Sequence, residues 1–420
     1  MNGMNCLGEQ LGQGTHNLFV LGDTVANMPR LIDSYAGQVQ LIYLDPPFQT
    51  GSRFTCRLQL GGHGHAAVCV PSYDDNMPSA GYYAMMREVL TGCHRLLSNE
   101  GSLFLHVDPR TCARFRIMLD EIFGEEHFVN EIIWHYKSGG RAKNHFSRKH
   151  DNILFYRKTK NAYFDITSVG MPRGRDMQNH MRRTVDEEGR VVYTIKSGGK
   201  VYTYSEDTPV YPSDVWTDIS HLQQKDPERT GYDTQKPEAL LKRIILSSSR
   251  PGDLVMDLFS GSGTTAAAAV KCQRRFVAMD ASPIALALLR RRILNREPTL
   301  MDAELPGTLL LFDAAKPPKA GKLEYACARA NGRVDVTLLS YAPPEGAEVP
   351  EHCEGLALLD YCALGFIKDG IFSACSQNLR PLRGGTVARL YLAPDRPGVC
   401  LLFCDVFGNQ SVIPVEEAAR

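Results

Sequence analysis

The chain has 420 residues, 43% of them hydrophobic and 22% charged, and its 47 basic and 47 acidic side chains give a formal net charge of zero. This length predicts two or three domains with an ample hydrophobic core. No apolar run approaches the length of a membrane span, and the first residues do not resemble a secretory signal, so we expect a cytoplasmic protein. The twelve cysteines are scattered without a Cys-x-x-Cys pair, which favours reduced thiols over disulfides or a metal site.

The segment Leu41–Phe48 ends an apolar run in an acid, two prolines and an aromatic ring. The run predicts a buried strand, which the prolines must end because each lacks a backbone donor and fixes its own φ. Asp45 is then left at the carboxyl end of a strand, where open α/β sheets bind their ligands. There Asp45 and the Pro46 carbonyl can accept the two N–H groups of a planar amine, while Phe48 stacks on its ring. The alternative is an ordinary strand-to-loop turn.

From residue 16 to about 160, strands and helices alternate as a mostly parallel sheet requires. The apolar spacing predicts helices over Tyr82–Leu97 and Ala113–Phe123, the second closed by a glycine. Asn130–Lys137 and Asn152–Lys158 are typical of a hairpin, joined by a basic loop.

Residues 161–230 lose this helical periodicity, and short strand-like pieces lie among glycine, proline and charge. Between Lys137 and Lys200 there are about fifteen basic residues against about six acidic ones, an excess that suits phosphate contacts. A solvated charged surface is the alternative. The candidate nucleic-acid contacts are Arg141, Lys143, Arg148, Lys149, Arg173, Arg175, Arg182 and Arg183.

A second motif follows at Asp253–Thr265, where a strand leads through a glycine turn into a run of strong helix formers. Glycines allow close backbone approach to a ligand, and the helix start offers free N–H groups. Arg275–Asp280 is another apolar strand that ends in an acid, at a distance that suits a ribose hydroxyl pair. The spacing Phe-x-Gly-x-Gly differs from the dinucleotide pattern Gly-x-Gly-x-x-Gly, so a dinucleotide is the less favoured ligand.

Together these motifs resemble those of the DNA amino-methyltransferases, which pair Asp-Pro-Pro-aromatic with Phe-x-Gly-x-Gly. The catalytic motif comes first, as in the β class, and the closest likeness is to adenine-specific enzymes similar to type III modification subunits. Those typically read Asp-Pro-Pro-Tyr-Asn-Thr-Gly where this chain has a phenylalanine and Gln49. Stacking survives the first change, whereas Gln49 puts any contact of the asparagine in doubt.

The resemblance implies a Rossmann-like α/β sheet that binds S-adenosyl-L-methionine, with an inserted target-recognition region and a small, mainly β carboxyl-terminal domain. The expected boundaries are 16–160 for the catalytic half, 161–230 for the recognition insert, 231–300 for the cofactor-binding half and 322–420 for the last domain, after a linker at 314–321. Double-stranded DNA is the implied partner, and a homodimer or a restriction subunit would be further ones.

The resemblance also assigns roles to individual residues. Asp45, Pro46, Pro47 and Phe48 form the catalytic motif. Asp23 would lie near the cofactor's adenine, and Lys236 would pair with its carboxylate, unless it is a solvated lysine before a helix. The remaining cofactor candidates are Asp257, Phe259, Gly261, Gly263, Thr264 and Asp280.

The implied reaction is methylation of the N6 amine of adenine in DNA, by direct displacement that calls for no metal. Related cytosine-N4 enzymes usually carry serine at the position of Asp45, which favours adenine but leaves cytosine N4 as the alternative. A protein glutamine methyltransferase would have the reverse motif order and an asparagine first. An inactive DNA-binding module is opposed by intact Asp45, Gly261 and Gly263.

Overall fold

The computed structural model describes residues 8–10, 16–60, 66–137, 142–173, 181–294, 308–313, 318–349, 353, 355–368, 370–381 and 385–416. Its centre is a nine-stranded sheet in which only one strand, β8, runs antiparallel to its neighbours. In spatial order the strands are β14 (Val215–Trp216), β7 (Phe128–His135), β8 (His150–Arg157), β6 (Leu97–Val107), β3 (Val39–Leu44), β15 (Leu254–Asp257), β16 (Arg275–Asp280), β2 (His16–Leu21) and β17 (Thr308–Asp313).

Helices cover both faces of this sheet, which explains why its central strands are apolar without alternation. All six residues of β3 are buried, as parallel strands covered on both faces must be. One face packs against α1 (Thr24–Tyr35), α2 (Ser79–Leu96) and α3 (Cys112–Phe123). The other packs against α4 (Glu238–Ser248), α5 (Thr264–Lys271) and α6 (Pro283–Leu294). The expected Rossmann-like α/β sheet, built from two blocks of sequence, is confirmed.

Two parts of this architecture differ from the sequence prediction. A hairpin of β4 (Arg53–Gln59) and β5 (Ala67–Asp74) follows the catalytic motif, in a region where only alternating strands and helices were expected. Strand β17 extends the sheet beyond residue 300, because it pairs in parallel with β2 along its whole length.

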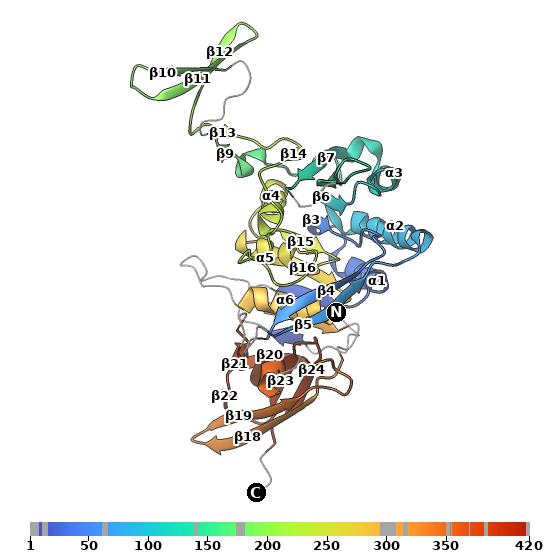
Figure 1. Cartoon of the computed structure of the whole chain (residues 1–420), viewed down its shortest axis with the longest axis vertical. Coiled ribbons are helices and arrows are strands. Elements are labelled where there is room, and N and C mark those ends of the chain that lie inside the picture. The colour runs from blue at the N-terminus through green and yellow to red at the C-terminus, as the bar shows by residue number, and fades with distance from the viewer. Residues whose placement is uncertain are drawn as a thin grey trace.

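The segment between the two blocks forms a small separate sheet of β10 (Arg182–Val185), β11 (Val191–Ser197) and β12 (Lys200–Ser205). It stands away from the main sheet at one end of the molecule (Figure 1). A short ladder of β9 (Met171–Pro172) and β13 (Pro209–Val210) lies at its base, and β14 returns the chain to the main sheet.

The carboxyl-terminal residues form the opposite end of the molecule (Figure 1). One sheet contains β1 (Gly8–Gln10), β21 (Ile371–Leu379), β20 (Leu359–Lys368), β23 (Val399–Asp405) and β24 (Gln410–Pro414). The other contains β18 (Lys322–Ala330), β19 (Arg333–Ala342) and β22 (Leu390–Pro394). A mainly antiparallel β domain was expected here, and the structure agrees.

This domain shares its core with the hairpin and with α6, which packs on the nine-stranded sheet. Leu58 and Val70 of the hairpin and Ile284 and Leu288 of α6 pack in one cluster with its strands. The buried Asp360 carboxylate accepts hydrogen bonds from Arg291 of α6 and from Arg380. Removing one member of such a buried ion network leaves the other charges buried without a partner, which destabilises the fold. The two parts therefore pack against each other and form one structural unit.

No helix among the residues that the structure describes is both long and apolar enough to cross a membrane.

Candidate active site

The catalytic motif leaves the sheet at the carboxyl end of β3 and is held by two side chains from outside it. The buried Asp75 carboxylate accepts the backbone N–H of Gln49 at 2.9 Å and both the N–H and the hydroxyl of Thr50 at 2.9 Å. Tyr82 of α2 donates its hydroxyl to the Pro47 carbonyl. This loop is therefore fixed before any substrate arrives.

Gln49 adopts a left-handed conformation, with φ at 54°. This conformation costs free energy for every residue with a Cβ, but the cost is smaller for asparagine than for glutamine. The asparagine that the family usually carries here therefore has a backbone reason, in addition to any side-chain contact. In this chain the Gln49 side chain donates to the Met77 carbonyl at 3.3 Å.

Lys236 forms an ion pair with Asp45. Its ammonium lies 2.6 Å from the Asp45 carboxylate and 5.1 Å from the centre of the Phe48 ring. The resemblance had given Lys236 a cofactor carboxylate as its partner, and nothing in the sequence indicated this contact with Asp45. The pair joins the catalytic motif, which follows β3, to the segment that precedes α4.

A buried chain of polar side chains runs beneath the catalytic motif. The Tyr43 hydroxyl lies 2.8 Å from His106 Nδ1, and His106 Nε2 lies 3.1 Å from the Asp151 carboxylate. Tyr136 donates its hydroxyl to the other Asp151 oxygen at 3.0 Å. Burial acts to raise the pKa of Asp151, but the contacts with His106, the charge of Lys236 and the hydrogen bond from Tyr136 together hold that pKa below its usual value. The Phe48 ring lies 5.9 Å from the His106 ring, so it has a rigid support.

The glycine turn lies on the neighbouring strand, between β15 and α5. Gly261 and Gly263 both have positive φ, at 47° and 73°. A Cβ on Gly261 would meet the Tyr232 ring at 3.2 Å, and one on Gly263 would meet Leu289 at 3.0 Å. Only glycine fits both positions, which explains the spacing of the motif.

Asp257 at the end of β15 and Asp280 at the end of β16 hold this turn in place by accepting hydrogen bonds. Asp257 accepts the N–H of Phe259 at 3.0 Å and the hydroxyl of Thr265. Asp280, at the end of β16, accepts the N–H of Gly261 at 2.8 Å and that of Ser282 at 2.8 Å. Burial raises the pKa of both acids, that of Asp257 to about 7.

Both motifs line one cavity of about 290 Å³. Asp23, which caps α1 by accepting the N–H of Ala26 at 2.8 Å, reaches it from β2. Of the predicted catalytic and cofactor residues, only Gly263 is absent from its wall, which contains Asp23, Asp45, Pro46, Pro47, Phe48, Lys236, Asp257, Phe259, Gly261, Thr264 and Asp280.

Three stacked aromatic rings form one wall of this cavity. The sequence analysis did not predict these rings. Phe54 of β4 stacks on Tyr73 of β5 at 4.8 Å between ring centres, and Tyr73 stacks on Tyr232 at 6.3 Å. The three rings come from distant segments that β4 joins, since Cys56 bridges to Tyr232. No local pattern signals such a wall.

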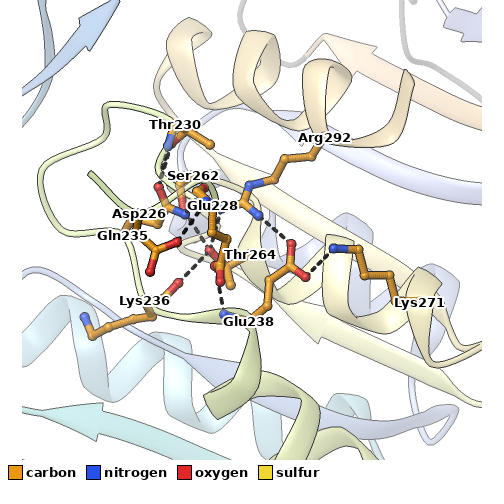
Figure 2. A network of polar contacts seen from close by, with 10 residues as sticks. All are labelled: Asp226, Glu228, Thr230, Gln235, Lys236, Glu238, Ser262, Thr264, Lys271 and Arg292. Atoms are coloured by element: carbon orange, nitrogen blue, oxygen red, sulfur yellow. Dashed lines mark hydrogen bonds and ion pairs between the residues drawn. The ribbon is translucent and has the colours of Figure 1, made fainter. Parts of the chain in front are cut away.

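A polar network holds the segment that carries Lys236 (Figure 2). Arg292 of α6 binds Glu238 at 2.9 Å and donates to the Thr264 hydroxyl at 3.2 Å. That hydroxyl in turn donates to the Lys236 carbonyl at 3.2 Å. Figure 2 shows the Lys236 side chain pointing away from this network, so its backbone is anchored while its ammonium is left for the catalytic motif.

The predicted basic contacts differ in their exposure to solvent. Lys143, Arg148, Arg182 and Arg183 are exposed, and Lys149 is partly buried. Arg141 and Arg175 lie outside the described residues.

Arg173 corrects the prediction of a DNA contact. It is only 8% exposed, and its guanidinium lies 4.6 Å from the centre of the Tyr204 ring. Its charge supports the small sheet by stacking on this aromatic face, so Arg173 packs the protein rather than facing a partner.

Comparison with known proteins agrees with this geometry. A family model described as DNA methylase, for N6 and N4 methyltransferases, matches residues 39–289. The chain belongs to the DNA methylase family.

Curated relatives of this DNA methylase include the type II methyltransferase M.EcaI of Enterobacter cloacae, 29% identical over 67% of this chain and 70% of the relative. The DNA adenine methyltransferase YhdJ of Escherichia coli (strain K12) is 27% identical over 65% of this chain and 81% of the relative. Among solved structures, the cytosine-N4-specific PvuII DNA methyltransferase is 16% identical, with a TM-score of 0.45 over 70% of this chain and 92% of that one.

The cofactor of this DNA methylase is S-adenosyl-L-methionine, and the cavity fits it. The buried Ser260 hydroxyl lies in the cavity wall and has no hydrogen-bond partner among the described residues, as a side chain awaiting a ligand would. Five aspartates and one lysine line the same wall, a charge balance that suits a sulfonium and an ammonium group.

Gln49→Asn should stabilise the protein by about 0.5 kcal/mol, because asparagine tolerates the left-handed conformation better than glutamine. The urea midpoint of unfolding measures this change. Gln273→Asn is the matched control, since Gln273 has φ at 63° in a turn that is not part of the cavity wall. A lower midpoint for Gln49→Asn alone would mean that the contact with Met77 outweighs the strain.

Asp257→Asn should remove a pH dependence of stability. The wild-type acid keeps its proton in the folded state up to about pH 7 but loses it near pH 4 when unfolded. Unfolding is therefore favoured as pH rises through this window, by up to roughly 1.4 kcal/mol per pH unit, and the effect is level above pH 7. Denaturant titrations of both proteins from pH 4 to 8 should show their stability difference growing and then levelling. A difference that is independent of pH, or one equally present in Asp33→Asn on the exposed side of α1, would contradict the assignment.

Proposed function

We propose that this DNA methylase transfers a methyl group to the N6 amine of adenine in double-stranded DNA. The observation that carries the proposal is the pairing of β3 with β15, in which Ile42 lies opposite Met256. Asp45 and Phe259 follow three residues later on each strand. A site for a planar amine and a site for the cofactor thus lie side by side.

The proposed roles follow from the donors and acceptors at the motif. The Asp45 carboxylate and the Pro46 carbonyl accept the two N–H groups of the target amine, which directs its lone pair toward the cofactor side of the cavity. Phe48, supported by His106, stacks on the face of the base and replaces stacking lost from the helix. S-adenosyl-L-methionine supplies the methyl group. The target nitrogen gives up one proton, for which Asp45 is the adjacent acceptor.

Lys236 has two proposed uses in this site. It balances the charge of Asp45 until the target amine takes its place, and its reach along the cavity wall keeps the cofactor carboxylate as a second partner. Methylation of cytosine N4 is the second candidate, since both amines present the same two donors. The aspartate at position 45, where related N4 enzymes usually have serine, favours adenine.

Methylation-sensitive long-read sequencing of DNA from cells that express the chain tests this proposal. We expect N6-methyladenine in one short sequence context, absent from cells that express Asp45→Ala. N4-methylcytosine in its place would select the second candidate, and unmodified DNA would remove both.

Asp45→Ala and Asp280→Ala should impair different steps, methyl transfer in the first variant and cofactor binding in the second. Asp45→Ala should abolish methyl transfer and leave cofactor affinity nearly unchanged, because it acts on the base. Asp280→Ala should weaken cofactor binding by roughly 1.5–3 kcal/mol, since two ribose hydroxyls lose a charged acceptor. Calorimetric titration with the cofactor alone and a turnover assay separate the two. Equal loss of cofactor binding in both variants would place Asp45 in the wrong pocket.

The recognition of sequence is assigned to the small sheet of the insert, and specifically to one of its faces. Its other face carries Tyr193, which is buried, and Tyr204, on which Arg173 stacks. Side chains alternate along a strand, so Arg182 and Lys196 share the opposite face. Both are exposed, and threonines lie between and beside them. We assign this open face to DNA.

Replacing both Arg182 and Lys196 by glutamine should weaken DNA binding and reduce its salt dependence by about 0.9 in log–log slope per lost phosphate contact. Fluorescence anisotropy at several salt concentrations measures both quantities. The matched control is Arg183→Gln on the face that carries Tyr193 and Tyr204, which should change them less, and cofactor affinity should stay intact throughout. An equal effect of the control, or altered cofactor binding, would count against this face.

A further inference from the structure

Phe146 is more exposed than any other large hydrophobic side chain that the structure describes. Its relative exposure is 99%, whereas the next is 64%. Single exposed apolar residues are common on proteins, so exposure alone decides nothing. The place of this ring in the fold and the charges beside it are what carry an inference.

Phe146 lies in the loop that joins β7 to β8, and this loop rises from the edge of the sheet that carries the catalytic motif. Strand β8 runs antiparallel to β6, which runs parallel to β3, so the beginning of β8 and the end of β3 meet at one edge. The base of the loop is closed by the N–H of Tyr136, which donates to the Lys149 carbonyl at 2.9 Å.

The two ends of the loop lie a short distance from the site assigned to the target nucleobase. Asp151, the second residue of β8, contacts His106 at 3.1 Å, and the His106 ring lies 5.9 Å from that of Phe48. The loop therefore begins beside the ring that is assigned to the target base. Residues 142–148, the described part of the loop that leads into β8, are long enough to reach the neighbouring part of a duplex, at about 3.3 Å per extended residue.

The chemistry around Phe146 is that of a nucleic-acid contact. Lys143 and Arg148 are exposed on either side of it in the sequence, and residues 137–150 contain no acid. An aromatic ring between cations fits a duplex, in which stacked bases lie between two lines of phosphate.

We propose that Phe146 is the wedge that enters the duplex at the target position and fills the space left by the extruded base. The proposal rests on the proposed DNA methylation. A base inside a duplex is out of reach of the motif, and extruding it costs the stacking and pairing of that base. An apolar side chain inserted at the vacated step restores part of that stacking. Lys143 and Arg148 hold the phosphates on either side while the ring enters.

The test compares two duplexes that carry the methylated sequence found by sequencing. One is fully paired, and the other has an abasic position opposite the target base, so that no base pair has to be broken. Phe146→Ala should lower kcat/KM about tenfold on the paired duplex but by only about twofold on the abasic one. Phe146→Trp should retain activity on both, because a ring remains. With 2-aminopurine at the target position, the fluorescence rise on extrusion should be smaller for Phe146→Ala.

Two sets of variants serve as comparisons. Ile117→Ala removes another large exposed side chain, 61% exposed on α3. It should leave kcat/KM unchanged on both duplexes. Lys143→Ala with Arg148→Ala should lower activity on both duplexes alike, since phosphates are present in each.

Each result decides one proposal. Equal loss on the two duplexes for Phe146→Ala, or no loss on the paired one, would overturn the wedge. If the wild-type protein methylates no DNA at all, the proposed function fails, whatever Phe146 does. If the methylated base is cytosine, the same comparison is made opposite that cytosine.

Discussion

The parallel pairing of β3 with β15 is the contact on which the site depends. These strands are more than two hundred residues apart in the sequence, yet each ends at the same edge of the sheet. Parallel neighbours bring their carboxyl ends together, so an acid that follows one strand meets a glycine turn that follows the other. The cores on the two faces fix this register, because a shift by one residue would move each side chain of the strand from one core to the other.

The second constraint is electrostatic. Asp45, Asp257 and Asp280 lie close enough that the charges of the other two raise the pKa of Asp257 further, beyond the effect of its burial. Lys236 is the cation among them, and a polar network behind it sets its position. A cavity with an excess of acids is costly to form without a cationic ligand. The acids that are ionised give the site a negative charge that a sulfonium cofactor can balance.

The two ends of the molecule have different relations to this centre. The carboxyl-terminal domain is locked to α6 and to the hairpin by a shared core and by the buried Asp360 network, so it belongs to the stability of the whole. In the part of the chain that the structure describes, short strands at the base of the small sheet connect it to the main sheet, and its open face carries exposed cations and threonines. An element so attached can change its surface chemistry without disturbing the catalytic centre.

The sequence by itself determined the α/β class, the order of the motifs and eleven of the residues that line the cavity. It did so because prolines, glycines and apolar runs act locally: Pro46 ends a strand, and the left-handed turns at Gly261 and Gly263 admit only glycine. The tertiary structure alone decided the pairing of Lys236 with Asp45, the chain from Tyr43 to Asp151 and the three stacked aromatic rings at Tyr73. These contacts join residues that are distant in the sequence, so no periodicity records them. It also decided that Arg173 is buried, because whether a cation stacks on a ring or meets solvent depends on which strand folds against it.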